Sequence, residues 1–289
     1  MTKWIRVSHD RHCPVCDSGG WCGISSDGSV VRCMRIKSDK ESIGSDGTLG
    51  WIHETNGKPI DYKRVPKPPA RSPKEWKTEA VKYYHAPRAE AFRGELAHNL
   101  GVSVESLEEL RVGVWGEGER EFATFPIWDW DRNIIGIITR MSSGKKLCIK
   151  GSKNSGLFYA LSWDKTNDCI FIPEGPSDVA AFLSAGLTAI GRPNNTGGVE
   201  QLKKILKPVI GKRRIVVVGE NDAKPEKRGT LDGCPEDCEG CGYCSPGLFG
   251  AKWVAGKLGV SYIMPPKGYK DFRAYWKSGS VWTDSLEML

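Results

Sequence analysis

Two short apolar runs in the second half of the chain stop abruptly at acidic residues. The run at residues 170–172 leads to Glu174, and the run at residues 215–218 leads to Glu220. A fully apolar run of this length, bounded by turn residues, predicts a buried strand. Each predicted strand therefore ends where carboxylates begin.

A strand–helix alternation surrounds these two runs. The Ala- and Leu-rich segment after the first run predicts a helix with Ser177 as its N-cap and Gly186 at its end. Apolar segments at residues 188–193 and 213–222 then flank a helical pattern that begins near Gly198. This order is typical of a parallel α/β sheet flanked by helices.

The acids at the strand ends are the first candidates for chemistry. Ligands of parallel α/β sheets bind beyond the carboxyl ends of the strands, and Glu174, Asp178, Glu220 and Asp222 all follow the two runs. We expect these acids to converge and to hold Mg²⁺, which prefers hard oxygen ligands. For any single acid, the alternative is a helix cap or a solvated carboxylate.

Length and composition predict one large hydrophobic core with a small satellite domain. The chain has 289 residues, of which 39% are hydrophobic and 27% are charged. No apolar run reaches the ~18 residues that a membrane-spanning helix needs, and the N-terminal residues lack an apolar signal region. We therefore expect a cytoplasmic protein without a membrane segment.

Positive charge is concentrated between residues 56 and 74. The formal net charge of the chain is +7, and this stretch holds six Lys and Arg residues against one acid, together with five prolines. The composition predicts a semi-rigid basic linker, which we assign to residues 56–76. The linker is either a solvated tether or a contact for nucleic-acid phosphates.

Four cysteines near the N-terminus have the spacing of a metal site, C-x2-C-x5-C-x10-C. They are Cys13, Cys16, Cys22 and Cys33. Zinc accepts four thiolates tetrahedrally and can fold a segment that has too little core of its own. In a cytosolic chain this spacing favours a metal over free thiols or disulfides. His9 and His12 flank the group, and either could replace one cysteine.

The remaining cysteines form a second group and two single residues. The second group, Cys234, Cys238, Cys241 and Cys244, has the spacing C-x3-C-x2-C-x2-C in a polar, Gly-rich insert at residues 224–247. We expect a second metal clip that holds zinc or an iron–sulfur cluster. Three roles are open for the insert: it covers a cleft, it presents a second surface for nucleic acid, or it is a metal-bound loop without a contact role. Cys148 and Cys169 adjoin apolar residues, which predicts that both are buried.

The motif Glu-Gly-Pro-Ser-Asp at residues 174–178, followed by acid-x-acid at 220–222, resembles the TOPRIM domain of primases, topoisomerases, recombination mediators and nucleases. Residues 122–141 resemble the hairpin of the primase amino-terminal subdomain, and residues 150–158 resemble the basic stretch before TOPRIM in phage primase-helicases. The cysteine module and the basic linker precede these motifs. In this order the chain resembles the zinc-finger/TOPRIM DNA primase family, which includes bacterial replicative primases and the primase half of bacteriophage primase-helicases.

The resemblance implies a fold class and a division into domains. The fold is an α/β TOPRIM core, a parallel sheet flanked by helices, with a primase-like α+β amino-terminal subdomain and a small zinc-binding β module ahead of it. The module takes residues 1–55, the linker 56–76, the subdomain 77–165 and the TOPRIM domain 166–289. The insert at 224–247 departs from the family, in which a short loop leads into the next helix.

The resemblance also implies roles for particular residues. The catalytic acids would be Glu174, Asp178, Glu220 and Asp222, and the ligands of Mg²⁺ or Mn²⁺ would be Glu174, Glu220, Asp222 and the outer candidate Asp271. For Asp271, the alternative is a helix N-cap. The template or triphosphate contacts would be Arg140, Lys150, Lys153, Arg192 and Lys270. Glu220 stands where the family has an aspartate, which would shift the metal by about one methylene length.

The implied function is a DNA primase, which makes short primers on single-stranded DNA from nucleoside triphosphates by metal-dependent nucleotidyl transfer. No GxxxxGK(S/T) motif occurs, so a replicative helicase would act in trans. Two alternatives stay open. The chain could be a TOPRIM-type metal-dependent nuclease, or a non-catalytic zinc/TOPRIM protein that binds single-stranded DNA.

Overall fold

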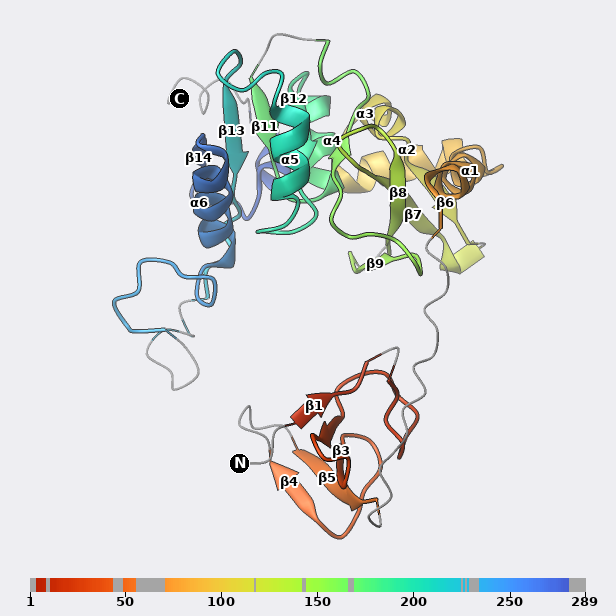
Figure 1. Ribbon diagram of the computed structural model, residues 1–289. Coiled ribbons are helices and arrows are strands. Elements are labelled where there is room, and N and C mark those ends of the chain that lie inside the picture. The colour runs from red at the N-terminus through yellow and green to blue at the C-terminus, as the bar shows by residue number, and fades with distance from the viewer. Residues whose placement is uncertain are drawn as a thin grey trace. The chain divides into compact units, whose positions relative to one another are not determined.

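A computed structural model describes residues 4–8, 11–43, 49–55, 71–116, 118–141, 144–165, 169–224, 226, 228 and 234–280. The chain divides into two units, Met1–Ala70 and Arg71–Leu289 (Figure 1). His9 and residues 56–70 of the expected linker lie outside the described residues. A helix begins at Pro73, so the last four residues assigned to the linker are helical instead. The other expected domain boundaries stay predictions.

The first unit is an antiparallel sheet in the order β1-β2-β3-β5-β4. Its strands are β1 (Trp4–Arg6), β2 (Gly23–Ser25), β3 (Val30–Cys33), β4 (Glu41–Ile43) and β5 (Leu49–Glu54). The buried core consists of Val7, Ile24 and Val31 together with three cysteines. A core this small depends on what the cysteines bind.

The second unit contains seven helices and nine strands within its described residues, with one short 3₁₀ helix. The helices are α1 (Pro73–Tyr84), α2 (Ala89–Leu100), α3 (Val104–Glu109), η1 (Gly118–Arg120), α4 (Pro176–Ser184), α5 (Val199–Leu206), α6 (Pro246–Leu258) and α7 (Phe272–Lys277). The strands are β6 (Gly113–Trp115), β7 (Phe122–Trp128), β8 (Ile134–Arg140), β9 (Lys146–Cys148), β10 (Phe158–Tyr159), β11 (Ile170–Ile172), β12 (Thr188–Gly191), β13 (Ile215–Val218) and β14 (Ser261–Ile263).

The sheet that follows the acidic motifs is parallel, as the strand–helix alternation predicts. Its order is β10-β12-β11-β13-β14, and only β10 at the edge is antiparallel. β11 and β13 are neighbours, with Ile170 opposite Ile215 and Ile172 opposite Val217. The carboxyl ends of both strands therefore lie at the same edge of the sheet.

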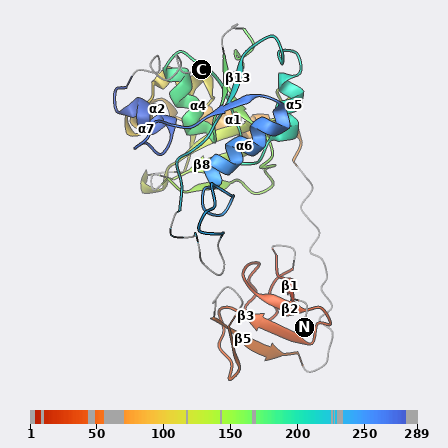
Figure 2. The same cartoon turned by 90° about the vertical axis from the view of Figure 1, so that its left-hand side faces the viewer.

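Side-chain alternation along β11 separates two cores. Ile170 and Ile172 belong to the core that contains Leu202 of α5 and much of α6. Phe171 points to the other core, where it stacks on Phe182 of α4 with ring centroids 4.8 Å apart. Figure 2 shows α4 and α7 on one side of β13 and α5 and α6 on the other. Strand residues buried on both faces account for the continuous apolar runs in the sequence.

A second sheet, β6-β7-β8-β9, is antiparallel and packs with α1 and α2, while α3 packs against α2 and α4. Backbone hydrogen bonds between Trp128 and Leu157 link its strand β7 to the segment before β10. Gly113 in β6 lies against the end of α1, where an added Cβ would sit 2.4 Å from the carbonyl carbon of Tyr83. The helix can approach the sheet this closely only because Gly113 has no side chain.

Two predicted helix starts have different outcomes. The helix expected near Gly198 is confirmed, because Gly198 is the N-cap of α5. Ser177 is not the N-cap of α4: the helix begins at Pro176, and Gly175 occupies the cap position with φ 78°. Proline sets its own φ near the helical value and so starts the helix one residue before the serine. In the described part of the chain, no helix combines the length and apolarity needed to cross a membrane.

The contact at Gly113 predicts a large difference between two glycine substitutions. Gly113→Ala should destabilise the protein by about 1–3 kcal/mol, because the new methyl group meets backbone atoms that cannot rotate away. Gly94→Ala in α2 is the matched control: no atom lies within 4 Å of its added Cβ, so alanine should be neutral or stabilising there. Urea unfolding of both variants tests this, and equal midpoints would contradict it.

Candidate functional site

Four carboxylates gather beyond the carboxyl ends of β11 and β13, and we call them the acidic edge: Glu174, Asp178, Glu220 and Asp271. Burial, together with the charges of Asp271 and Glu220, raises the pKa of Asp178 to about 8. Burial and the charge of Glu174 also raise the pKa of Glu220. The four groups are thus close enough to repel one another in a partly desolvated place.

Basic side chains accompany every acid of this edge. The distances from carboxylate oxygen to basic nitrogen are 3.5 Å for Glu174–Arg192, 3.6 Å for Glu220–Lys270, 3.5 Å for Asp178–Arg273 and 3.6 Å for Asp271–Arg273. The Asp178–Arg273 pair lacks hydrogen-bond geometry, since Asp178 Oδ1 and Arg273 Nε are both buried without a hydrogen-bond partner. Arg273 therefore does not hold Asp178 in a hydrogen-bonded ion pair, which agrees with the raised pKa of this carboxyl group.

Arg140 and Lys146 approach the acidic edge from the second sheet. They face each other across the β8–β9 pairing. Burial lowers the pKa of Arg140, as does Arg273, while Asp178 and Asp271 raise it. The charge of Lys146 lowers the pKa of both Asp178 and Glu220. Arg140 thus lies near Asp178 and Asp271, and its contact with template or triphosphate stays a prediction.

The sequence prediction missed Lys146 and Arg273. Lys146 could have been found from the expected hairpin, because the strand that returns after Arg140 brings a Lys-Lys pair back toward it. Arg273 lies two residues after Asp271, in the first turn of α7. The sequence around Arg273 does not indicate a role at the acidic edge, because that role depends on the orientation of α7.

Arg192 differs from its expected role as a nucleic-acid contact. Its side chain has no exposed surface, and its guanidinium donates to the carbonyl oxygens of Asn194, Asn195 and Val218. The buried cation therefore joins β12 to β13 and faces Glu174 from inside the protein. Arg192 is therefore placed to position the acidic edge, and it is not accessible to a nucleic-acid strand.

Asp222 and Asp271 make specific backbone contacts. Asp222 Oδ1 accepts a hydrogen bond of 2.7 Å from the amide of Gly247 at the start of α6. Asp271 is the N-cap of α7 and accepts a 2.7 Å bond from the amide of Ala274. The N-cap alternative for Asp271 is thus confirmed, although the residue also belongs to the acidic edge.

The carboxylates are chemically suited to bind a divalent cation, but their oxygen atoms do not lie close enough together to form a complete ligand set. Within the described ranges, the groups of three or more possible ligands that lie close enough to hold an ion are the two cysteine groups. At the acidic edge, Asp178 Oδ1 has no hydrogen-bond partner, and the pKa values of Asp178 and Glu220 are raised, so the protein's own cations do not fully satisfy these carboxyl groups. Carboxylate oxygens are the ligands that Mg²⁺ and Mn²⁺ prefer, so the donor set fits such an ion.

The remaining predicted cations are exposed. Lys270 lies at the acidic edge beside Glu220. Lys150 and Lys153 follow β9, and the amide of Lys153 donates to the carbonyl of Ile135 near the start of β8. Arg140 ends the same strand. The fold thus anchors Lys153 toward the end of β8 that lies away from Arg140.

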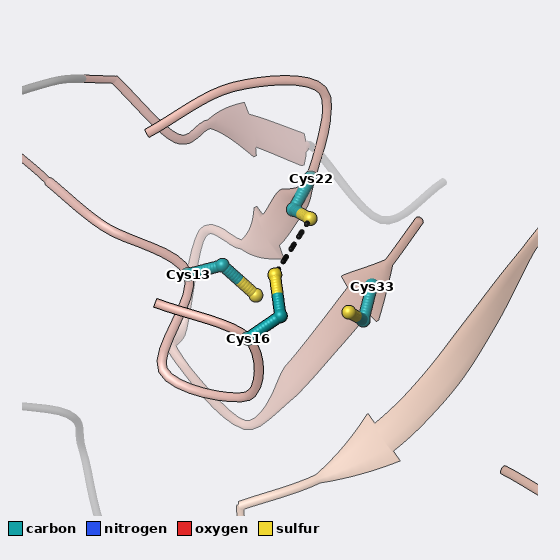
Figure 3. A group of neighbouring side chains, drawn as sticks. All are labelled: Cys13, Cys16, Cys22 and Cys33. Atoms are coloured by element: carbon teal, nitrogen blue, oxygen red, sulfur yellow. Dashed lines mark hydrogen bonds between the residues drawn. The ribbon is translucent and has the colours of Figure 1, made fainter. Parts of the chain in front are cut away.

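The N-terminal cysteines point toward a common centre (Figure 3). All four sulfur atoms lie within 4.8 Å of one another, and the Sγ atoms of Cys16 and Cys22 are 3.7 Å apart. A zinc–sulfur bond of about 2.3 Å implies about 3.8 Å between the sulfurs of a tetrahedral site. Amides of Met34 and Ile36 donate to the sulfurs of Cys22 and Cys33. The group therefore fits zinc.

The second cysteine group fits a metal equally well. The Sγ–Sγ distances are 3.9 Å for Cys241–Cys244 and 3.8 Å for Cys238–Cys244, and all four sulfurs lie within 4.8 Å. The amide of Lys224 donates to the carbonyl of Cys244. Because α6 begins two residues after Cys244, this cysteine group also helps to position the amide of Gly247, which contacts Asp222.

The single cysteines differ from each other. Cys148 is exposed, so its predicted burial is wrong. It lies on the edge strand β9, where a side chain has no neighbouring strand to cover it. Cys169 is partly buried and packs beside the core of α4.

Comparison with known proteins gives structural similarities alone, since no family model and no curated protein matches the chain. A DnaG primase catalytic domain bound to single-stranded DNA aligns with 75% of this chain and 79% of its own, at 12% identity and a TM-score of 0.49. The Escherichia coli primase catalytic core aligns with 75% and 78%, at 13% identity and 0.49. The primase fragment of the bacteriophage T7 primase-helicase aligns with 96% of both chains, at 13% identity and 0.44.

The two cysteine groups predict about two tightly bound metal ions in the purified protein. Cys22→Ser and Cys244→Ser should each lose one ion, because a structural site does not hold its metal with one thiolate removed. Cys148→Ser is the matched control and should keep both. Elemental analysis measures the content, and a Cys244→Ser protein with unchanged metal would refute the second clip. Iron in place of zinc would identify that clip as a cluster.

The pKa of Asp178 predicts how stability depends on pH. Between the ordinary value of 3.8 and the raised value of about 8, the folded protein holds a proton that the unfolded chain has released. The free energy of unfolding must therefore fall as pH rises through this window. Asp178→Asn removes the titrating carboxyl group. The melting temperature of this variant should therefore fall less than that of the wild type between about pH 5 and about pH 8.

Asp131→Asn provides the control for that measurement, because Asp131 is exposed in the β7–β8 turn. It should follow the wild-type curve. The melting curves are recorded with a chelator that removes Mg²⁺ and Mn²⁺ but leaves the metals of the cysteine sites in place. No bound cation then changes the titration of the acidic edge. Parallel pH curves for Asp178→Asn and wild type would show that Asp178 is ionised in the fold.

Proposed function

We propose that the chain is a DNA primase that joins nucleoside triphosphates on single-stranded DNA by metal-dependent nucleotidyl transfer. The observation that carries this proposal is the acidic edge, where carboxylates and exposed cations meet beyond the carboxyl ends of parallel strands. Ligands bind at this place in open α/β sheets. The cysteine module at the N-terminus supports the proposal, since it would contact unpaired template bases.

The resemblance to TOPRIM primases supports a role for each acid, including Asp222, which is not part of the acidic edge as defined above. Glu174, Glu220 and Asp222 would hold Mg²⁺ or Mn²⁺, which when bound stabilises the charge on attacking and leaving phosphate oxygens. Asp222 uses Oδ1 for the amide of Gly247, which leaves Oδ2 for a ligand. Asp178, with its raised pKa, keeps a proton at neutral pH and so limits repulsion within the edge.

The cations of the site would act on the triphosphate. Lys270 is 65% exposed, and Lys146 is exposed on β9, so both can reach a phosphate without leaving the fold. Arg140 and Arg273 are more buried and act as fixed charges beside it. Preorganised cations stabilise charge that develops in the transition state without having to reorient.

A non-catalytic binding protein is the second candidate, favoured by one observation. Glu174, Asp178, Glu220 and Asp271 each lie within 4 Å of a basic nitrogen, an arrangement that is stable without a metal. A TOPRIM-type nuclease would use the same edge to hydrolyse a phosphodiester. In either active case, the substrate phosphates would compete with Glu220 for Lys270. For a primase, a replicative helicase would act in trans.

Incubation with circular single-stranded DNA, labelled nucleoside triphosphates and Mg²⁺ distinguishes the three functions. New oligonucleotides identify a primase, shortened DNA a nuclease, and a gel shift alone a binding protein. Asp222→Asn should reduce primer synthesis by about 100-fold or more, because several kcal/mol of charge stabilisation is lost and each ~1.4 kcal/mol is a factor of ten. Glu220→Gln should behave similarly.

Glu90→Gln is the matched control, since Glu90 is an exposed acid in the first turn of α2. It should prime at the wild-type rate. A folded Asp222→Asn protein with undiminished synthesis would show that this acid has a structural role only. Binding of single-stranded DNA should survive in every acid variant, because Lys and Arg side chains carry it.

A further inference from the structure

A cavity of about 520 Å³ lies in the second unit between α1 and the β7–β8 hairpin. We call it the basic groove, because its charged lining residues are all basic: Lys74, Lys77, Arg111 and Arg132, with His85 beside them. No acidic side chain lines it. The volume is within the ~300–1,000 Å³ of ordinary ligand pockets.

One face of α1 supplies the first wall of the basic groove. Lys74, Lys77, Val81 and Tyr84 recur at helical spacing and so share a face. The buried residues Trp76 and Tyr83 lie on other faces of the helix. Val81 is 48% exposed although it is apolar. The capping box of Ser72 with Glu75 sets where this helix begins.

Two turns supply the opposite wall. Arg111 and Arg132 have φ of 57° and 60°, and they are two of the four non-glycine residues with positive φ in the described chain. Left-handed backbone is strained for residues with a long side chain. Such strain is more frequent at binding sites than elsewhere, and here both strained residues direct a cation to one groove.

The positive charge of the groove is largely uncompensated. Arg132 pairs with Asp164 at 2.5 Å, and Arg111 lies 5.6 Å over the ring of Tyr84. Lys74 and Lys77 form no ion pair with any residue that the structure describes. Charge complementarity therefore calls for a ligand with more than one negative group.

The groove also has apolar lining residues. Trp128, Pro126, Ile134 and Leu161 line it together with the cations. Grooves that bind single strands combine such surfaces for bases with Lys and Arg for the backbone. A phosphodiester strand thus matches the groove in both respects, whereas an acidic peptide would match only the charge.

The basic groove is distinct from the acidic edge. Ile134, in the groove, begins β8, and Arg140, beside the acids, ends it. A strand of this length spans about 20 Å. We propose that the basic groove binds a segment of single-stranded DNA whose continuation lies at the acidic edge. The identity of that segment as template rests on the proposed function.

The test is the binding of a fluorescent oligothymidylate of about 15 nucleotides, a length within the site sizes of such grooves. Lys74→Glu with Lys77→Glu should weaken binding about tenfold and reduce the slope of log affinity against log salt by about 1 to 2. Lys207→Glu with Lys212→Glu changes the net charge equally on exposed residues outside the groove, and it should have little effect. Equal losses in the two variants would overturn the proposal.

Two further arms make the result decisive. Lys74→Ala with Lys77→Ala should show the same direction of change, and it replaces the charge reversal if that protein does not fold. Competition by ATP identifies the ligand: displacement of the oligonucleotide at low ATP would reassign the groove to a free nucleotide and overturn the strand assignment. Binding is measured without nucleotide addition. A wild type that makes no primers would therefore refute the proposed function while leaving this result readable.

Discussion

Parallel pairing of β11 with β13 is the constraint on which the candidate site depends. Once Ile170 lies opposite Ile215, the residues after both strands must emerge at one edge of the sheet. That geometry brings Glu174 and Glu220 together despite their mutual repulsion, and burial together with the charge of Glu174 raises the pKa of Glu220. The stability of the arrangement comes from the two apolar cores on either side of the sheet, not from the acids.

Cations around this edge divide into a buried and an exposed set. Arg192 is buried, donates to two carbonyl oxygens of the loop after β12 and to one of β13, and lies beside Glu174. Lys270 and Lys146 reach the edge from exposed positions. Removing a buried cation would leave carboxylate and carbonyl oxygens unpaired in the protein, while exposed lysines can exchange partners with a phosphate at little cost. The first set positions the site, and the second set is available to a ligand.

The two cysteine groups stand where hydrophobic burial is insufficient. The first unit has a core of a few residues, three of them cysteines. The insert before α6 is polar and Gly-rich, and its last cysteine precedes by three residues the amide that contacts Asp222. A metal–thiolate site supplies folding free energy over a short sequence distance. In the insert, this local order extends through the amide of Gly247 to Asp222.

Features set by short-range patterns were predictable from the sequence alone. The cysteine spacings, the apolar runs and the strand–helix alternation indicated both cysteine groups, the parallel sheet and the convergence of Glu174, Asp178 and Glu220 at its edge. Each of these features depends on neighbours in sequence or on a general rule of sheet topology. The burial of Arg192, the exposure of Cys148, the contact of Asp222 with Gly247 and the approach of Lys146 and Arg273 were decided only by tertiary structure. These depend on which distant segment packs against each side chain, and no local pattern in the sequence encodes that partner.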